Sequence, residues 1–171
     1  MDIRTATIED LSAISAIEDE CFSAENAVSA EVLEKRLRCF GDHFWIMSDG
    51  GRVVGFVDGF VTDEPDITDD MYEIPELHNE SGRWQMLFGV ATSPEYRGRG
   101  IASELIRRVI EDSKAQGRAG LVLACKDELV DFYARFGFVN EGISNKTYHG
   151  GSEWNQMRMC LNTDNSVFGR K

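Results

Sequence analysis

A short segment in the middle of the chain has the residue types and spacing of a phosphate-binding turn. It reads RGRGIA over residues 97–102 and lies between a predicted strand and a predicted helix. Gly98 and Gly100 leave backbone N–H groups uncovered, and together with the helix N-terminus these groups form a concave anion site. Arg97 and Arg99 add positive charge that suits phosphate oxygens. The segment therefore predicts a pyrophosphate site, although glycines between a strand and a helix also serve ordinary turns.

The glycine spacing excludes two common nucleotide-binding motifs. No Lys-Ser or Lys-Thr pair follows the glycines, so the segment is not the phosphate loop GxxxxGK[ST]. It is not GxGxxG either, because Ser103 stands where the last glycine would be.

The elements that must position this segment alternate between strands and helices. Apolar alternation and turn residues predict strands at residues 3–7, 43–47, 53–61, 84–91, 120–125, 138–143 and 154–161. Helical periodicity predicts helices that begin after the capping residues Thr7 and Ser29, and further helices at residues 102–110 and 129–136.

Other parts of this outline also bear on function. Gly55 and Gly59 lie inside a predicted strand, which suggests that another part of the molecule approaches the backbone closely there. Residues 62–82 are acidic and aperiodic, and a loop of this length is usually a binding loop, a lid or disordered. Residues 162–171 are polar and predict a loose tail.

Length and composition predict a globular protein. A chain of 171 residues, 42% hydrophobic and 28% charged, fits one domain over residues 1–171. No apolar run approaches the roughly 18 residues that span a bilayer, and the N-terminus lacks the apolar region of a signal peptide, so we expect a cytoplasmic protein without membrane contact. The scattered cysteines form no CxxC pair and predict reduced thiols and no metal site.

The formal net charge of −12 limits the partners. Nucleic acid binding needs a basic face, so we expect no nucleic acid partner. An acidic surface attracts cationic small molecules such as amines, although solubility alone also accounts for such a charge. The sequence leaves a homodimer open.

Two motifs together resemble the GNAT superfamily of N-acetyltransferases. Residues 97–102 match its [Q/R]xxGx[G/A] pyrophosphate motif, and FYARFGF at residues 132–138 is similar to its FYxxxGF signature. The resemblance covers nearly the whole chain. It implies a single α/β (α+β) domain with a mixed, mostly antiparallel central sheet, splayed middle strands and flanking helices.

A narrower resemblance points to the serotonin (arylalkylamine) N-acetyltransferases. LACKDELVDFY at residues 123–133 is similar to the C[E/K]DxLVxFY stretch of that branch. EDECF at residues 18–22 and GGSEW at residues 150–154 also resemble it.

The resemblance implies acetyl-CoA as the acetyl donor, in a wedge between the predicted strands 84–91 and 120–125. A bulge in the first strand would free backbone groups, and an N–H near Val90 would bind the thioester carbonyl. The implied cofactor contacts are Phe88, Gly89, Val90, Arg97, Gly98, Arg99, Gly100, Ile101, Ala102 and Phe132.

The resemblance also implies a direct attack of a primary amine on the bound donor. Tyr133 matches the general acid that donates a proton to the departing CoA sulfur. Relatives with an HxH pair deprotonate the amine through those histidines, but Trp84 and Met86 stand at these positions here. Glu25 is our first candidate for the replacement base.

Several alternatives for the base and the acceptor stay open. Glu18, Glu20, His43, His78 and His149 are the other candidate bases. The apolar residues Phe22, Phe56, Phe60, Trp84 and Met86 predict a pocket for an aryl group, although such residues also form plain core. The acidic residues of the 62–82 loop predict attraction of cationic amines. We expect a small arylalkylamine acceptor. The alternative acceptors are a polyamine and a protein N-terminus or lysine. A further alternative is a non-catalytic acetyl-CoA sensor.

Overall fold

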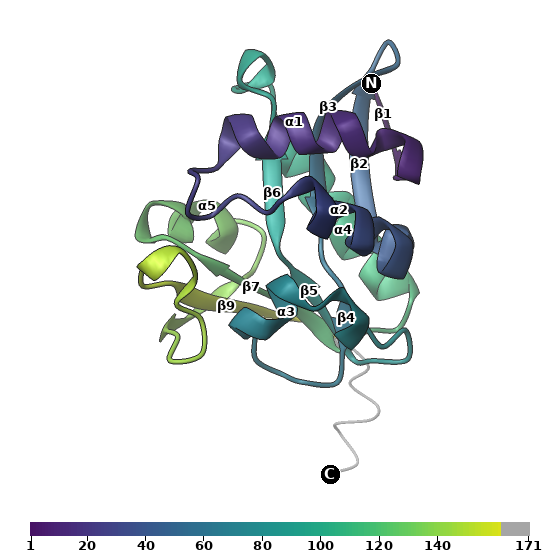
Figure 1. The fold of residues 1–171 in the computed structure, drawn as a ribbon. Coiled ribbons are helices and arrows are strands. Elements are labelled where there is room, and N and C mark those ends of the chain that lie inside the picture. Colours follow the sequence, from purple (N-terminus) through teal and green to yellow (C-terminus); the bar gives the residue numbers. More distant parts are fainter. Residues whose placement is uncertain (162–171) are drawn as a thin grey trace.

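Two β-sheets, which diverge from each other, form the centre of the molecule (Figure 1). The computed structural model describes residues 1–161, so the predicted tail at residues 162–171 lies outside the described residues. The first sheet is antiparallel and has the order β1 (Asp2–Thr5), β2 (Phe44–Asp49), β3 (Arg52–Asp58), β6 (Gly89–Thr92). The second sheet has the order β4 (Val61–Thr62), β5 (Trp84–Leu87), β7 (Gly120–Cys125), β9 (Asn155–Cys160), β8 (Val139–Ile143). Within it, β5 and β7 are parallel and the other pairs are antiparallel.

Helices cover both faces of the first sheet (Figure 1). α1 (Leu11–Cys21) and α2 (Ala30–Phe40) pack on one face, and α4 (Ile101–Ala115) packs on the other. Strand β2 explains this arrangement, because successive side chains of a strand point to opposite faces. Phe44 and Ile46 join the core beneath α1 and α2, whereas Trp45 and Met47 join the core beneath α4.

The two sheets separate because two neighbouring strands change sheet at the same level. The segment 52–62 leaves the first sheet after β3, and Gly59 and Phe60 lead into β4. The segment 84–92 leaves the second sheet after β5 and enters the first as β6, with Phe88 between them. A Cβ on Gly59 would lie 1.6 Å from the Met86 carbonyl oxygen, so only glycine allows the two breaks to lie side by side. The close approach expected at Gly59 is confirmed.

The helix starts follow their capping residues. The Ser29 side chain accepts the N–H of Val32 and caps α2 as predicted. Thr7 caps a short 3-10 turn, Ile8–Asp10, that leads into α1. The Asp10 carboxylate accepts the Thr7 N–H and two bonds from Arg4, and the Arg4 guanidinium is the main reason that the pKa of Asp10 is lowered.

The prediction that residues 62–82 lack regular structure is wrong. The segment contains α3 (Asp69–Glu73) and a 3-10 turn, Pro75–Leu77, and it covers one face of the second sheet. Ile67, Met71 and Tyr72 are buried there. These apolar residues are too few and too widely spaced to give a period, yet their burial stabilises the segment. α5 (Val130–Ala134), which follows a 3-10 turn at Asp127–Leu129, is shorter than the predicted helix 129–136.

Candidate functional site

The break between β5 and β6 opens a gap beside β7. β6 is the last strand of the first sheet, so its outer edge has no strand partner among residues 1–161. Ser93 donates its N–H to the Val54 carbonyl, and the ladder pairs Val90 with Val57. Because hydrogen-bonded and non-bonded pairs alternate in an antiparallel ladder, the Val90 N–H points away from β3 and into the gap. It is therefore free to bind a carbonyl oxygen there.

A groove of about 450 Å³ leads from this gap to the start of α4. Gly98 and Gly100 have φ angles of 79° and 80°, in the left-handed region that favours glycine. No atom lies within 4 Å of a Cβ built on either residue, so both face open space. The first amides of α4 have no partner within the helix, and they face the groove together with this turn. The geometry is that of an anion site.

The two arginines of the turn have different surroundings. Arg97 is exposed, and its Nη2 lies 3.6 Å from the Sγ of Cys21 on α1. The Arg99 guanidinium lies over the ring of Tyr96, 4.6 Å from its centroid, and does not line the groove. Arg97 is thus the arginine side chain of the turn that lines the groove.

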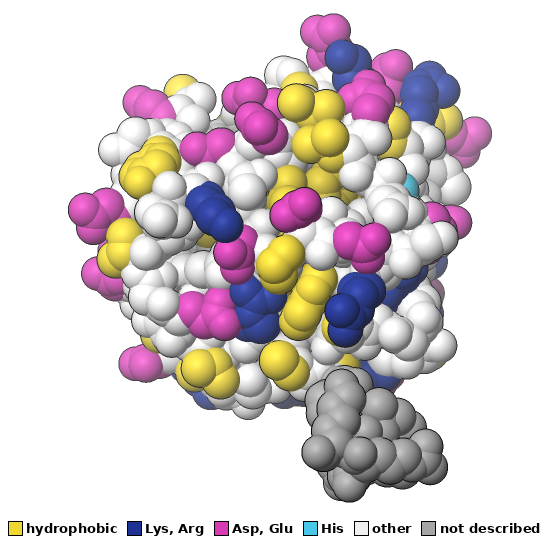
Figure 2. Space-filling view, turned by 90° about the horizontal axis from the view of Figure 1, so that it is seen from below, with side chains coloured by type: hydrophobic (Ala, Val, Ile, Leu, Met, Phe, Trp, Pro, Cys, Tyr) yellow, Lys and Arg dark blue, Asp and Glu magenta, His cyan; other side chains and the backbone are white. Residues whose placement is uncertain are grey.

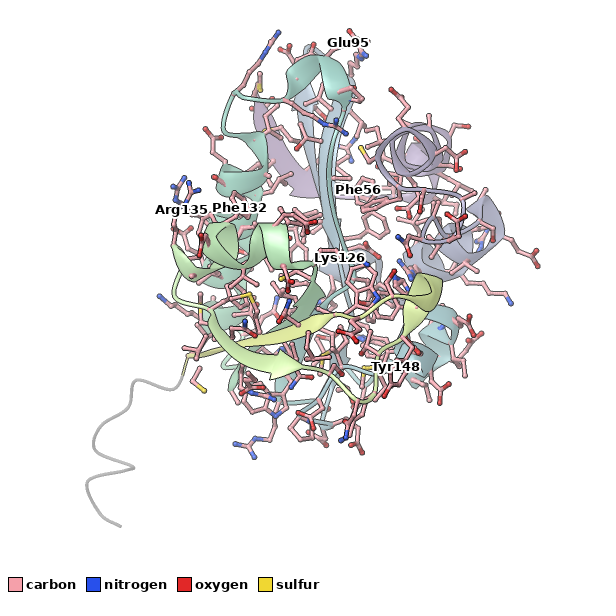
Figure 3. All side chains as sticks on the ribbon, turned by 90° about the vertical axis from the view of Figure 1, so that its left-hand side faces the viewer. Phe56, Glu95, Lys126, Phe132, Arg135 and Tyr148 are labelled. Atoms are coloured by element: carbon pink, nitrogen blue, oxygen red, sulfur yellow. The ribbon has the colours of Figure 1, made fainter. Side chains whose placement is uncertain are left out.

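The groove also contains apolar side chains from outside the turn. Phe132 on α5 contributes one wall, and Figure 3 shows it on the helix that follows Lys126. Leu129, at 45% exposure, lies between this groove and a second cavity. The predicted cofactor residues that line the groove are Val90, Arg97, Gly98, Gly100, Ile101, Ala102 and Phe132.

The second cavity, of about 90 Å³, lies on the other side of the gap and is called the acceptor pocket below. Phe88, Gly89 and Val90 of the β5–β6 break form its floor. Phe22, Val90 and Leu129 line both cavities, so the two are adjacent. The other lining residues come from α1, the loop after it, α2, α3, β7, α5 and the loop before β9.

Glu18 is the acidic residue of α1 that lines the acceptor pocket. Its side chain lies on the last turns of α1 and the residue is only 4% exposed. One carboxylate oxygen, Oε2, accepts the N–H of Val28 at 3.0 Å. Burial raises the pKa of Glu18 to about 7, the Val28 N–H opposes the shift, and the nearby Asp58 carboxylate adds to it. A carboxyl group with this pKa can exchange a proton near neutral pH.

A buried ion pair supports the pocket beside Glu18. Arg36 of α2 donates from Nη1 to Asp58 Oδ2 at 2.9 Å and from Nη2 to the Tyr72 carbonyl at 2.7 Å. Its guanidinium also lies 5.0 Å from the centre of the Phe88 ring. Arg36 thus connects α2, β3, α3 and the β5–β6 break, and it holds the walls of the pocket together.

Tyr133 reaches the same pocket from α5. It is 6% exposed, and its hydroxyl has no hydrogen-bond partner among residues 1–161. Burial raises the pKa of Tyr133, and the neighbouring Cys125 adds to the effect. The phenol therefore keeps its proton at neutral pH. Burial also raises the pKa of the Cys125 thiol, to about 11, so this thiol is a neutral group in the wall.

Aromatic side chains form much of the remaining wall. The His149 ring lies between Tyr72, at 4.4 Å, and Trp154, at 4.9 Å. The Tyr72 ring in turn lies 4.8 Å from Phe88. Burial lowers the pKa of His149. The ring set can therefore pack against an apolar group of a bound molecule.

The structure brings only some of the predicted acceptor-site residues into this pocket. Phe22 lines it, but Phe60 and Met86 are fully buried in the core beneath α3, and Trp84 packs against that core and under Arg158. The apolar face that they share is covered by the segment that was predicted to be irregular. Phe56 is likewise core, beneath α1.

The structure does not bring Glu25 into the pocket. The chain turns at Ser23, whose carbonyl accepts the N–H groups of Asn26 and Ala27, and Glu25 is exposed on this turn. Glu20 is exposed as well and lines a separate hollow beside the 3-10 turn Ile8–Asp10. His43 and His78 lie in a different cluster, which is described below.

Several pocket residues carried no signal in the sequence. Arg36 and Asp58 lie in a predicted helix and a predicted strand, where charged residues usually face solvent. Tyr72 lies in the segment predicted to be irregular. Only their burial, 2%, 0% and 6% exposed, distinguishes them, and burial depends on tertiary contacts.

Charged side chains of both signs are interspersed on the face shown in Figure 2. Hydrophobic side chains lie between them, and the lysines and arginines do not gather into one stripe on this face. Among the described residues, no helix is both long enough and apolar enough to cross a membrane.

Comparison with known proteins assigns the family. The model of the acetyltransferase (GNAT) family matches residues 11–138, which include α1, the RGRGIA turn, α4, β7 and α5. The chain belongs to the GNAT family of acetyltransferases. The expected fold class is confirmed with it.

Curated relatives share about a third of the aligned residues. N-acetyltransferase 8 of Rattus norvegicus is 30% identical over 119 residues, which are 67% of this chain and 47% of the relative. N-acetyltransferase 8B of the same organism is 32% identical over 117 residues, 66% of this chain and 46% of the relative. The chain thus spans about half the length of these relatives. Their names do not test the arylalkylamine branch, which stays a prediction.

Solved structures share the fold at low identity. The loading GNATL domain of CurA from Lyngbya majuscula has a TM-score of 0.81 at 20% identity and covers 94% of this chain and 97% of that one. The GNAT-like decarboxylase GphF, in complex with isobutyryl-CoA, has a TM-score of 0.82 at 20% identity, with coverages of 95% and 100%. YncA, a putative acetyltransferase from Salmonella typhimurium with its cofactor acetyl-CoA, has a TM-score of 0.69 at 15% identity, with coverages of 95% and 94%.

Proposed function

We propose that the protein is an acetyl-CoA-dependent N-acetyltransferase that acetylates a primary amine, with Glu18 as the base and Tyr133 as the acid. The observation that carries this proposal is the acceptor pocket itself. A carboxyl group with a pKa of about 7 and a protonated phenol without a partner both line it, beside the free edge of β6.

The groove from the β5–β6 break to α4 suits the donor. Its anion site can hold a pyrophosphate, and its apolar walls can hold the chain that connects this group to the thioester. Two structures with this fold contain isobutyryl-CoA and acetyl-CoA, which supports an acyl-CoA here. Bound acetyl-CoA would supply the acetyl thioester, and the Val90 N–H would stabilise the charge that develops on its carbonyl oxygen.

Glu18 would prepare the acceptor. An amine enters as an ammonium ion, and only the free amine is nucleophilic, so a base must remove a proton. The Glu18 carboxylate attracts the ammonium ion, and with a pKa of about 7 it is largely ionised just above neutral pH. After transfer, the proton rests on Glu18 and the acetyl group on nitrogen.

Tyr133 would complete the transfer. As the carbon–sulfur bond breaks, the departing CoA thiolate takes the proton of the Tyr133 hydroxyl, and the second proton of the amine nitrogen, lost as the amide forms, restores the phenol. No covalent acetyl-enzyme is needed, because the neutral Cys125 thiol is a poor nucleophile.

The acceptor that the pocket favours is a small arylalkylamine. Its aryl group would pack among Tyr72, Phe88, His149 and Trp154, while its amine would reach Glu18. An ammonium group of a polyamine can also lie on these rings, but it does not cover their apolar surface as an aryl group does. The pocket therefore supports the aromatic amine over the polyamine.

The test is CoA release from acetyl-CoA with tryptamine, phenethylamine, spermidine and a lysine-containing peptide. We expect turnover with the two aryl amines. Glu18→Gln should lower that turnover by about 10²–10⁴-fold, the usual contribution of a positioned base, and leave acetyl-CoA binding unchanged. Silence with every amine while acetyl-CoA still binds would favour the sensor over the enzyme.

Glu25→Gln is the matched control, because Glu25 carries the same charge seven residues further along but is exposed. It should retain wild-type turnover. Loss of activity in Glu25→Gln together with full activity in Glu18→Gln would contradict the assignment of the base.

A further inference from the structure

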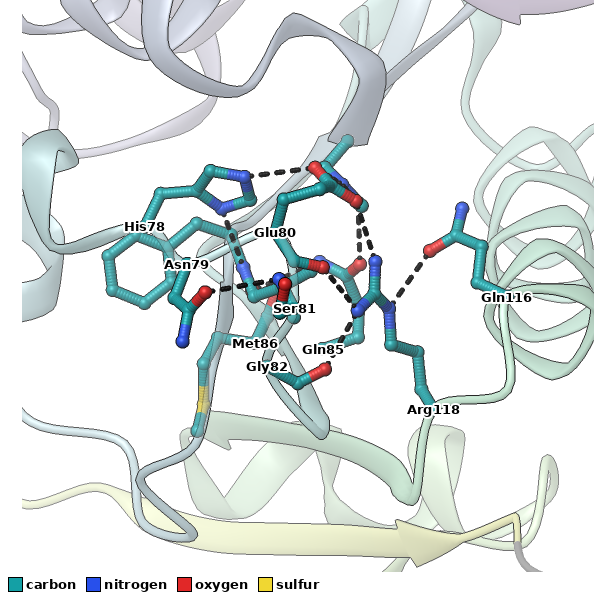
Figure 4. Close-up of polar contacts among 12 residues, drawn as sticks. His78, Asn79, Glu80, Ser81, Gly82, Gln85, Met86, Gln116 and Arg118 are labelled. Carbon is teal, nitrogen blue, oxygen red and sulfur yellow. Dashed lines mark hydrogen bonds and ion pairs between the residues drawn. The ribbon is translucent and has the colours of Figure 1, made fainter.

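A second polar cluster lies at the far end of β5, outside the acceptor pocket. It joins His43 before β2, His78 and Glu80 after the Pro75–Leu77 turn, Gln85 of β5 and Arg118 before β7. Figure 4 shows Glu80 between His78 and Arg118. His43 is 1% exposed, whereas the Glu80 side chain is 63% exposed.

Gln85 determines which nitrogen of His43 carries a proton. The Gln85 Nε2 donates to the carbonyls of Phe60 and Met86, at 3.3 and 2.9 Å. Its Oε1 therefore faces His43 Nδ1, at 2.9 Å, as an acceptor. A flipped amide would turn its oxygen toward two carbonyl oxygens, so Nδ1 of His43 must donate.

The backbone determines the protonation of His78 in the same way. The Val61 N–H donates to His78 Nδ1 at 3.0 Å, so this nitrogen carries no proton. A neutral His78 then has its proton on Nε2 and donates it to Glu80 Oε1, at 3.1 Å. Burial lowers the pKa of His78, which agrees with a neutral ring.

The Glu80 carboxylate therefore requires a second proton on His43. The His43 Nε2 lies 2.9 Å from Glu80 Oε1 and 3.1 Å from Oε2, and Arg118 Nη2 donates to Oε2 at 2.7 Å. Burial raises the pKa of Glu80, but the hydrogen bonds from His43 and His78 outweigh it, so this pKa is lowered and the carboxylate accepts all these bonds. With Nδ1 already a donor, a hydrogen bond from His43 Nε2 to this carboxylate requires a proton on both ring nitrogens.

A metal ion fits the cluster less well than a proton does. The ring nitrogens of His43 and His78 and the Glu80 carboxylate lie close enough to hold an ion. A ligating histidine normally donates its other N–H, whereas His78 uses Nδ1 as an acceptor. Arg118 also occupies one carboxylate oxygen with a positive charge.

We propose that His43 and Glu80 form a proton-dependent clamp. While His43 carries both ring protons, its bond to Glu80 adds to the bonds from His78 and Arg118 that hold residues 75–83 against β5, and the loss of one proton loosens this segment. After that loss, an Nε2 lone pair would face the carboxylate, and only His78 and Arg118 would hold Glu80. The other charged groups around His43 are Arg118 and, across the Trp45 ring, Asp112 with its partner Arg108.

The clamp acts on the chain that leads to the acceptor pocket. Residues 75–83 continue from α3, whose Tyr72 lines that pocket. Arg118 also donates to the carbonyls of Glu80 and Gly82, so part of the anchor stays when His43 is neutral. Where the proposed amine acetylation holds, release of the clamp raises the KM for the acceptor and leaves donor affinity unchanged.

The test follows the His43 ring by ¹⁵N NMR from about pH 5 to about pH 9, the range in which imidazoles titrate. At the acidic end we expect both nitrogens to be protonated. As pH rises, one proton should be lost, and the hydrogen-exchange protection factors of residues 75–83 should fall with it. This measurement needs no substrate, so its failure is separate from a failure of the proposed function.

Glu80→Gln tests the mechanism, and because Glu80 is exposed the variant should fold. We expect a singly protonated His43 throughout, and protection factors of residues 75–83 that no longer change with pH. Glu76→Gln is the control, with the same charge change in the same segment but outside the cluster, and it should behave as the wild type. A singly protonated His43 in the wild type near pH 5, or Zn²⁺ added alone binding through both histidines, would overturn the proposal.

Discussion

The donor groove and the acceptor pocket share a gap, but different kinds of chemical group form them. The anion site of the groove uses main-chain groups from one contiguous turn, and its glycines are required by their φ angles and by the open space beside them. The pocket uses side chains from segments between α1 and the loop before β9. Main-chain sites tolerate most changes in distant packing, whereas a side-chain site depends on every element that supplies a wall. The donor should therefore be bound in many backgrounds in which acceptor turnover is lost.

The largest expected effect breaks the groove and leaves the pocket intact. Gly100→Asp places a carboxylate at the anion site, and we expect acetyl-CoA affinity to fall by more than about 100-fold, since one like-charge contact costs several kcal/mol. Gly100→Asn is the matched variant, because both residues tolerate the left-handed region and only one is charged. Calorimetric titration with acetyl-CoA measures the difference. Equal affinities in the two variants would place the pyrophosphate elsewhere.

A change of pH should affect the acceptor pocket much more than the donor groove, the reverse of the Gly100→Asp variant. Turnover needs an ionised Glu18, so kcat/KM should fall about tenfold per pH unit below its pKa of about 7. The pyrophosphate would be held by backbone N–H groups and by Arg97, so the Kd for acetyl-CoA should change much less than kcat/KM. Initial rates and titrations from about pH 5 to about pH 9 give both curves. A rate that stays flat through pH 7 would remove Glu18 from the role of base.

The buried Glu18 of the acceptor pocket should lower the free energy of unfolding above neutral pH. The pKa of Glu18 is raised in the folded state, so its favourable contribution exists at low pH and is lost as pH rises from about 4.5 to about 7. Near pH 8 the fold contains a buried carboxylate. Glu18→Gln should then raise the free energy of unfolding by about 2 kcal/mol, because glutamine is neutral and can still accept the Val28 N–H. Urea unfolding measures it, and the gain should vanish near pH 4.

The smallest expected effect concerns Cys125, in the wall of the acceptor pocket. Cys125→Ser should change turnover by no more than about threefold, because the Cys125 thiol is neutral and contacts Met157. Mass spectrometry of the enzyme with acetyl-CoA alone should show no acetyl group on Cys125. An acetylated Cys125 that transfers to amine would replace direct attack by a two-step reaction.

The features that the sequence predicted lie mostly on the donor side of the gap. The turn at residues 97–102 and the FYARFGF motif are local patterns, and both lie at the gap. Ser29 was readable as a cap for the same reason, since a cap depends on the next three residues. Such features need no knowledge of distant segments.

The residues of the acceptor pocket were harder to predict from the sequence, because small displacements along the chain determine which side chains line it. Glu18 and Glu25 are seven residues apart, and the end of α1 at Cys21 places one in the pocket and the other in solvent. Trp84 and Met86 stand where the resemblance to serotonin N-acetyltransferases predicted the proton-accepting positions, yet Ile67 and Met71 cover their face. The apolar residues at positions 67–72 are too sparse to have predicted that this segment covers the sheet.

The double break at Gly59 and Phe88 has a mechanical consequence. Two adjacent segments of the chain cross between the two sheets. Their hydrogen-bond ladder is incomplete where the chain departs from β7 after β5 and continues as β6. A molecule that binds in that gap with its own amide and carbonyl groups takes the place of a missing rung. Because one apolar core, with Val57 of β3 and Leu123 of β7, already joins the two sheets, such a molecule would add a backbone link to a connection made by side chains.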